Sequence, residues 1–302
     1  MEGPVDDAGI RLPRPLARRA GDVLAGKVPP AAARDAATVM LLRPARPARP
    51  ARLAGDGPAG QQGDEDGLEV YMLRRKPSMA FAPGAFVFPG GSVDPRDADE
   101  EVAWAGPGGA EWGRIFDAPA QLARALVCAA VRETFEESGV LLAGPAAATV
   151  VADTTGDDWE ADRLALLDRS LSLAEMLRRR RLVLRADLLR PWSRWITPVV
   201  EERRFDARFF AAALPPGQRT RDVGGEAAQV AWIRPADAIA AGRRKEIVLW
   251  LPTAVSLGEL ADCASVAAAL AAPRQVTPLL PEVTMRAGTA WIKVPGNQEH
   301  PL

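Results

Sequence analysis

The segment Arg132-Glu133-Thr134-Phe135-Glu136-Glu137-Ser138-Gly139 indicates more about the fold than any other part of this chain. In a helix, the spacing of Glu133, Glu136 and Glu137 puts the three carboxylates on one face. Glu133 and Glu137 are like charges one turn apart, which by itself costs roughly 0.2–0.5 kcal/mol. Because hard cations such as Mg²⁺ prefer carboxylate oxygens, the pattern predicts a metal site on a helix.

The residues before this segment predict the helix itself, over 118–138. Apolar side chains recur there at spacings of three and four, and Gly139 is placed to cap the C-terminus. The C-terminal end of a helix is unfavourable for anions because of the macrodipole. Function therefore explains the acidic side chains at this end better than stability does.

A second informative segment is Phe88-Pro89-Gly90-Gly91-Ser92-Val93-Asp94. It is typical of a strand that ends in a Pro-Gly-Gly turn. Glycine lacks a Cβ, so the backbone at Gly90 and Gly91 can come close to a ligand or metal.

Composition excludes several classes of protein. The chain has 302 residues, is 48% hydrophobic and 25% charged, and has a net charge of −1. These values are typical of a globular protein with a core, and they disfavour nucleic acid as a partner. Two cysteines cannot form a disulfide framework or a zinc cluster, and they fit a reducing compartment.

Targeting signals and histidine chemistry are also disfavoured. No apolar run approaches the ~20 residues of a membrane span, and no apolar h-region follows the N-terminal arginines, so we expect a cytoplasmic protein without membrane association. The one histidine is His300. Acid–base chemistry must therefore fall to carboxylates, lysine, Tyr71 or metal-bound water.

The order of segments predicts one main domain over residues 36–272. Residues 1–35 are expected to be poorly ordered and 273–302 to form a C-terminal tail. Residues 43–67, with a repeated Arg-Pro-Ala triplet, predict a solvated hairpin loop; a basic arm that contacts polyanions is the alternative. Residues 98–117 predict an irregular insert. Strands and helices in this mixed order indicate an α/β protein, an α/β/α sandwich around a mixed sheet.

Together the two segments resemble the signature of the Nudix hydrolases. Gly91 is followed after five residues by Asp97, where the family has Glu, and the box continues with Arg132-Glu133, Glu136-Glu137 and Gly139. Between Asp97 and Arg132 lie 34 residues where the family has seven, so the insert is 27 residues longer. A split box is similar to the subgroup of peroxisomal coenzyme A diphosphatases. Further resemblance to that subgroup covers Arg74-Arg75, Met79, 81–85, 87–91, 195–198, 204–206, 208–210, Trp232, Pro235 and 251–253.

The resemblance implies a Nudix-type sandwich with an insert within the box and extra C-terminal helices. It also implies Mg²⁺- or Mn²⁺-dependent hydrolysis of a nucleoside diphosphate linked to another moiety. From the subgroup we expect coenzyme A or acyl-CoA as substrate, giving a 4′-phosphopantetheine product and adenosine 3′,5′-bisphosphate. ADP-ribose, NADH or dinucleotides are the alternative substrates. A nucleotide-sensing module without catalysis is a second alternative, which the intact carboxylates disfavour.

The family also implies residue roles. Metal ligands would be Glu133, Glu136, Glu137 and the carbonyl of Gly90, with Arg132 holding the carboxylates. Structural roles in the box fall to Gly91, Asp97 and Gly139. The general base would be Glu133 or a carboxylate outside the box; of the outside candidates Glu201, Glu202 and Glu226 we prefer Glu226, because it precedes the strand expected at 229–233.

Substrate contacts and the insert complete the predictions. Arg74, Arg75 and Lys76 could bind substrate phosphates, such as the 3′-phosphate of coenzyme A, or form a solvated strand end. Trp195, Phe205 and Phe209 fit a core better than an adenine-stacking site. The insert could be a lid, a specificity wall or a homodimer contact. Its Trp104 and Trp112 predict a packed segment, since two indoles are costly to leave in water.

Overall fold

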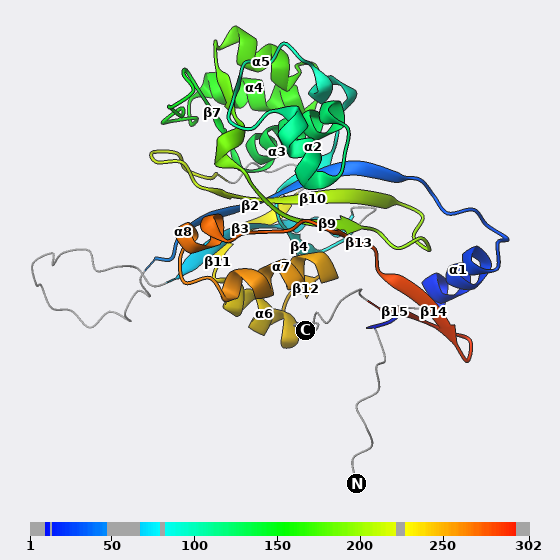
Figure 1. Ribbon diagram of the computed structural model, residues 1–302. Coiled ribbons are helices and arrows are strands. Elements are labelled where there is room, and N and C mark those ends of the chain that lie inside the picture. The colour runs from blue at the N-terminus through cyan, green and yellow to red at the C-terminus, as the bar shows by residue number, and fades with distance from the viewer. Residues whose placement is uncertain (1–9, 13, 47–66, 79–81, 222–226, 294–302) are drawn as a thin grey trace, which may run out of the picture.

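The computed structural model describes residues 10–12, 14–46, 67–78, 82–221 and 227–293 (Figure 1). At its centre lies a sheet with the strand order β12-β4-β3-β2-β10-β9-β13, with β11 paired to β3 and β5 paired to β2. The strands are β2 (Ala33–Pro44), β3 (Leu68–Arg75), β4 (Ala85–Val87), β5 (Gly90–Ser92), β9 (Arg190–Ile196), β10 (Arg204–Ala213), β11 (Ala227–Ile233), β12 (Val248–Leu249) and β13 (Pro278–Leu279).

Alternating side chains of the central strands fill two separate cores. On β2, Val39 and Leu41 belong to one apolar cluster, whereas Met40 and Leu42 belong to the other. Strand β2 runs parallel to β10 and antiparallel to β3 and β5, so the sheet is mixed. Successive residues of a strand point to opposite faces, so a sheet buried on both sides needs a layer of helices on each.

Helices supply these two layers, one above and one below the sheet in Figure 1. One face is covered by α2 (Gly109–Phe116), α3 (Ala120–Ser138), α4 (Asp157–Leu167) and α5 (Leu173–Arg179). The other is covered by α6 (Pro235–Arg243), α7 (Leu251–Ala261) and α8 (Val266–Ala271). The predicted α/β/α sandwich with a mixed sheet and C-terminal helices is confirmed.

The central helix α3 agrees closely with the sequence. It begins at Ala120 and ends at Ser138, and 14 of its 19 residues are buried. Gly139 has a φ of 73° and its N–H donates to the carbonyl of Phe135, which confirms it as the C-terminal cap. The carboxylates therefore lie in the last two turns, as predicted.

The insert is more regular than the sequence suggested. It contains β6 (Trp104–Ala105) and α2, so the prediction of an irregular segment was wrong. Glycines that look like helix breakers allow close packing instead: a Cβ on Gly109 would lie 2.6 Å from the carbonyl oxygen of Ala120. Trp112 is buried and stacks on Phe116 with ring centroids 5.7 Å apart, which confirms the packed insert.

The described segments nearest the two termini pack on each other. We expected residues 1–35 to be poorly ordered, but α1 (Arg14–Leu24) follows β1 (Ile10–Arg11), and β1 pairs with β15 (Thr289–Lys293). The error arose because the apolar partner comes from the distant C-terminus, where β15 pairs with β14 (Glu282–Arg286). A small separate core joins the ends, made of Leu12, Ala17, Ala20, Val200 and Ala290.

Several smaller predictions can also be checked. Two helices, α4 and α5, follow α3 in the chain, and α7 and α8 are separate helices, with Ser265 capping α8. The remaining elements are β7 (Ala143–Gly144), β8 (Val183–Arg185), η1 (Pro95–Ala98) and η2 (Ala186–Leu188). Most of the loop expected at 43–67 lies outside the described residues. None of the described helices has the length and apolar character to cross a bilayer.

Candidate active site

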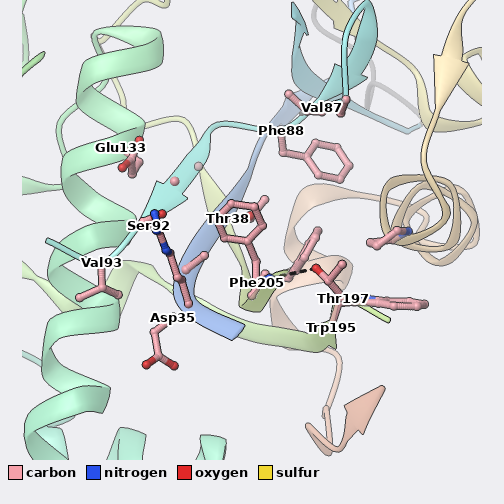
Figure 2. Close-up of a pocket in the computed structure, with 18 of the residues that line it drawn as sticks. Asp35, Thr38, Val87, Phe88, Ser92, Val93, Glu133, Trp195, Thr197 and Phe205 are labelled. Atoms are coloured by element: carbon pink, nitrogen blue, oxygen red, sulfur yellow. Dashed lines mark hydrogen bonds between the residues drawn. The ribbon is translucent and has the colours of Figure 1, made fainter. Parts of the chain in front are cut away.

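The acidic face of α3 forms one wall of a cavity of about 1170 Å³. Glu133 and Glu136 are buried, with 9% and 6% of their surface exposed, and Glu137 is half-buried. Figure 2 shows Glu133 on the helix at one side of the cavity, with Phe88, Phe205 and Trp195 at the other. Buried carboxylates must be paired or solvated, so their partners decide what the wall can bind.

Arg132 is the main partner of these carboxylates. Its Nε and Nη2 donate to the two carboxylate oxygens of Asp97, at 3.0 and 2.9 Å. Its Nη1 donates to Glu133 at 2.7 Å and, more weakly, to Glu136 at 3.3 Å. Nη2 also reaches the carbonyl of Ser92 at 2.9 Å. Arg132 thus ties α3, β5 and η1 together.

Asp97 reaches Arg132 because η1 carries it there. Asp94 caps this short helix, and its own N–H donates to the Oδ2 of Asp97 at 2.8 Å. Asp97 is only 4% exposed. The shorter acid in place of the family's glutamate therefore makes a complete two-pronged contact, which is the strong form of an arginine–carboxylate pair.

The two glycines bring β5 close to both of its neighbours. A Cβ on Gly91 would lie 2.3 Å from the Oε1 of Glu133, and one on Gly90 would lie 2.5 Å from the carbonyl oxygen of Ala37. The sequence predicted a close approach of the backbone at these glycines. In the structure Gly91 lies close to the carboxylate of Glu133, and Gly90 lies close to strand β2. In addition, the N–H of Gly90 donates to the Oε2 of Glu137 at 2.9 Å.

The carbonyl of Gly90, predicted as a metal ligand, is turned away from β2. The hydrogen bonds between this segment and β2 fall on alternate residues, because the N–H of Val39 donates to the carbonyl of Pro89 and the N–H of Val93 donates to the carbonyl of Asp35. In the register of β5 with β2, Gly90 is one of the residues between these positions. In an antiparallel ladder the backbone groups of the intervening residue point outwards. Gly90 therefore presents its backbone on the side of α3.

Negative charge is in excess at this wall. Asp97, Glu133 and Glu136 share the single guanidinium of Arg132. Burial raises the pKa of Glu133 and of Glu136, and the charge of Arg132 opposes this. Additional positive charge in the cavity would relieve the repulsion between the carboxylates.

A hard divalent cation fits this donor set, because its members are carboxylate and carbonyl oxygens. Within the described part of the chain, however, no three acidic, histidine or cysteine side chains already stand in a metal-binding cluster. Glu133 and Glu136 contact Arg132 instead, and Glu137 accepts the Gly90 bond. The chemistry of the donors supports a metal, and nothing in it distinguishes Mg²⁺ from Mn²⁺.

Only one of the three basic residues predicted to contact phosphate lines the cavity. Arg75 lines it, whereas Arg74 and Lys76 are exposed and do not. Adjacent residues of β3 point to opposite faces, which separates Arg74 from Arg75. The aromatic candidates Trp195, Phe205 and Phe209 all line the cavity, and Trp195 and Phe209 are buried as well, so these two also belong to the core.

The base candidates outside the box are also separated. Glu201 lines the cavity, and burial raises the pKa of its carboxyl. Glu202 does not line it and instead lies 3.7 Å from Arg19. Glu226 lies outside the described residues, so the preference for it stays a prediction. The described part of β11 begins at Ala227, paired with Arg75.

Several arginines of the cavity were not predicted from the sequence, and Arg163 and Arg169 are two of them. Arg163 is buried on α4, and its Nη1 donates to the backbone carbonyl of Glu136 at 2.9 Å. It thus bonds a carbonyl of the last turn of α3, which has no partner within the helix. Arg169, in the turn after α4, also lines the cavity. No motif marks either residue, because only the packing of α4 brings them here.

Comparison with known proteins shows which family the chain resembles. A family model described as the NUDT19 Nudix domain matches residues 111–260. Over these residues the chain is similar to a Nudix hydrolase domain. The match begins within the insert, so it includes Arg132 and the carboxylates of α3 but not the Pro-Gly-Gly turn or Asp97.

Relatives and a solved structure agree with this Nudix assignment. The acyl-coenzyme A diphosphatases NUDT19 of Xenopus laevis and Homo sapiens are 26% and 30% identical, over 64% and 65% of this chain. The matched part spans only 59% and 60% of those relatives' lengths. A NUDIX hydrolase from Alicyclobacillus acidocaldarius superposes with a TM-score of 0.64 and 26% identity, covering 81% of this chain and 98% of that one.

Proposed function

We propose that this chain hydrolyses the diphosphate of coenzyme A or acyl-CoA, releasing a 4′-phosphopantetheine product and adenosine 3′,5′-bisphosphate. The observation that carries the proposal is the buried acidic face of α3, held by Arg132 and Asp97 in the wall of a large cavity. The relatives named acyl-coenzyme A diphosphatase support the choice of substrate. The cavity is large enough for an extended ligand, since drug-sized ligands occupy roughly 300–1,000 Å³.

In the reaction, water attacks one phosphorus atom of the diphosphate and the bridging P–O bond breaks, so that each product keeps one of the two diphosphate phosphates and the 3′-phosphate stays on the adenosine. A divalent cation, Mg²⁺ or Mn²⁺, held by Glu133, Glu136, Glu137 and the Gly90 carbonyl would neutralise phosphate charge and acidify the attacking water. Arg132 and Asp97 fix the positions of the carboxylates. Arg75 and the aromatic wall bind the rest of the substrate.

A carboxylate takes the proton of the attacking water. Glu201 is a described candidate outside the box, because it lines the cavity and burial raises the pKa of its carboxyl towards the working range of a base. Glu133 and Glu226 are the other candidates. Glu201→Gln separates these: a fall in kcat of at least about 100-fold assigns the base to Glu201, and a fall of less than about threefold returns it to the other two.

The test of the function is product analysis by mass spectrometry. The panel comprises CoA, acetyl-CoA, ADP-ribose, NADH and diadenosine polyphosphates, each with Mg²⁺ or Mn²⁺ and with EDTA as the metal-free control. We expect adenosine 3′,5′-bisphosphate from CoA, lost in Glu136→Gln and retained in Glu111→Gln. Glu111 is the matched control because it is an exposed glutamate on α2 outside the cavity.

Other results would change the assignment in distinct ways. Cleavage of ADP-ribose or NADH alone would keep the mechanism and reject coenzyme A as substrate. A folded, metal-loaded protein that stabilises on adding a nucleotide but cleaves nothing would support the non-catalytic sensing module.

A further inference from the structure

We propose that Arg169 binds the diphosphate of the substrate, as a cation placed beside the acidic face from outside the Nudix box. The proposal rests on the proposed function and adds a residue to it. Arg169 lies in the turn between α4 and α5 and lines the same cavity as Glu136.

The backbone of Arg169 is fixed while its side chain is not engaged. Its N–H donates to the carbonyl of Leu166 at 3.0 Å, and its own carbonyl accepts a bond from Arg96 at 2.9 Å. Among the residues that the structure describes, its guanidinium has no hydrogen-bond or ion-pair partner, and the residue is exposed. The backbone of Arg169 is therefore fixed while its guanidinium is available to bind a ligand in the cavity.

The turn itself is connected to the acidic wall. Arg96, which holds the Arg169 carbonyl, makes a two-pronged pair with Asp94, at 3.0 Å for both contacts. Asp94 caps η1, and η1 carries Asp97 to Arg132. The short helix η1 therefore positions both Arg132, which contacts the carboxylates of α3, and the turn that carries Arg169.

Charge favours Arg169 over its neighbours as a phosphate contact. Three other arginines near the carboxylates are already paired with acidic side chains: Arg96, Arg132 and Arg163. Arg169 and Glu136 line the same cavity. An arginine fork matches phosphate oxygens and keeps its charge at any working pH.

A structural role for Arg169 is the competing explanation, because cations also suit the C-terminal end of a helix. Arg181 provides a matched control. It is exposed, follows α5, and has a φ of 55° where Arg169 has 64°, yet it does not line the cavity. Asparagine tolerates this left-handed backbone, so Arg169→Asn and Arg181→Asn remove one charge each at equal backbone cost.

The experiment measures hydrolysis and binding for the wild type, both asparagine variants and Arg169→Lys. For whichever diphosphate the enzyme cleaves, we expect kcat/KM to fall about 10- to 100-fold in Arg169→Asn, the range for one lost charge-assisted contact. Arg169→Lys should recover part of this loss, and Arg181→Asn should stay within about twofold of wild type. Equal effects of the two asparagine variants, or no effect of Arg169→Asn, would overturn the proposal.

Binding of ADP, measured by calorimetry with Mg²⁺, separates this proposal from the proposed function. If no diphosphate is cleaved, the function fails, but a loss of ADP affinity confined to Arg169→Asn still supports the phosphate contact. Wild-type protein that does not bind ADP, or equal affinity of wild type and Arg169→Asn, would refute the contact even if hydrolysis is found.

Discussion

Replacing Asp97 by the family's glutamate should weaken this protein. Asp97 is 4% exposed and its carboxylate already takes two bonds from Arg132 and one from the N–H of Asp94, all between 2.8 and 3.0 Å. An added methylene must displace either the carboxylate or η1, and overpacking of this kind typically costs about 1–3 kcal/mol. Asp97→Glu should therefore lose that amount. Asp97→Ala should lose about 3 kcal/mol, the lower end for a broken buried pair, because Arg132 keeps its other acidic partners.

Urea unfolding followed by tryptophan fluorescence measures both effects, provided that the denaturant slope stays the same among the variants. Asp262→Glu is the control, since Asp262 is exposed and follows α7, and a change there should stay within about 0.5 kcal/mol. An Asp97→Glu variant as stable as wild type, or more stable, would refute the reasoning. It would mean that η1 does not fix the distance between the acid and Arg132.

Other predictions concern the packing around the site. Gly91→Ala should abolish most activity, because its Cβ would lie 2.3 Å from the Oε1 of Glu133, while Gly21→Ala, with no atom within 4 Å, should leave activity unchanged in the same assay. Arg163→Gln should lower the free energy of unfolding by about 1.5–3 kcal/mol, the usual value for hydrogen bonds of a charged group. Native alkylation followed by mass spectrometry should modify Cys263 but spare Cys128, because burial raises the pKa of Cys128 to about 12 and leaves almost no thiolate at pH 8.

The elements of the fold that carry local patterns were predictable from the sequence. Helix α3 carries an apolar stripe, a glycine cap and three acidic residues within twenty residues. The predicted helix, 118–138, therefore agrees with the observed helix, Ala120–Ser138, to within two residues at each end. The terminal α1 was not, because α1 buries few side chains by itself and gains its core from β15, almost 270 residues away. The residue pattern within one segment cannot predict a packing partner that lies so far away in the sequence.

The site likewise combines residues that local sequence patterns predicted with residues that only tertiary packing brings together. Arg132 and the three glutamates share one helix, so their proximity followed from spacing. The approach of the Pro-Gly-Gly turn and Asp97 to that helix was expected only from the resemblance to the Nudix signature. Arg163 and Arg169 line the cavity because α4 packs beside the end of α3. This contact between two helices could not be predicted from residue spacing in the sequence. The run Arg74-Arg75-Lys76 shows the opposite error: three adjacent basic residues suggested one site, but alternation along β3 leaves only Arg75 in the cavity.

The long insert between the two halves of the box is compatible with a stable site because it builds its own core. Closing a loop of 34 residues rather than seven costs only about 1.4 kcal/mol in chain entropy, since this cost grows with the logarithm of length. Full burial of one side chain such as Phe116 contributes about 1.5–3 kcal/mol, which offsets that cost. Trp112 adds more, because it packs on both Phe116 and Phe210 of β10. The insert therefore braces α3 against the sheet, and a variant that shortens it should lose more stability by exposing this aromatic cluster than it gains from the shorter loop.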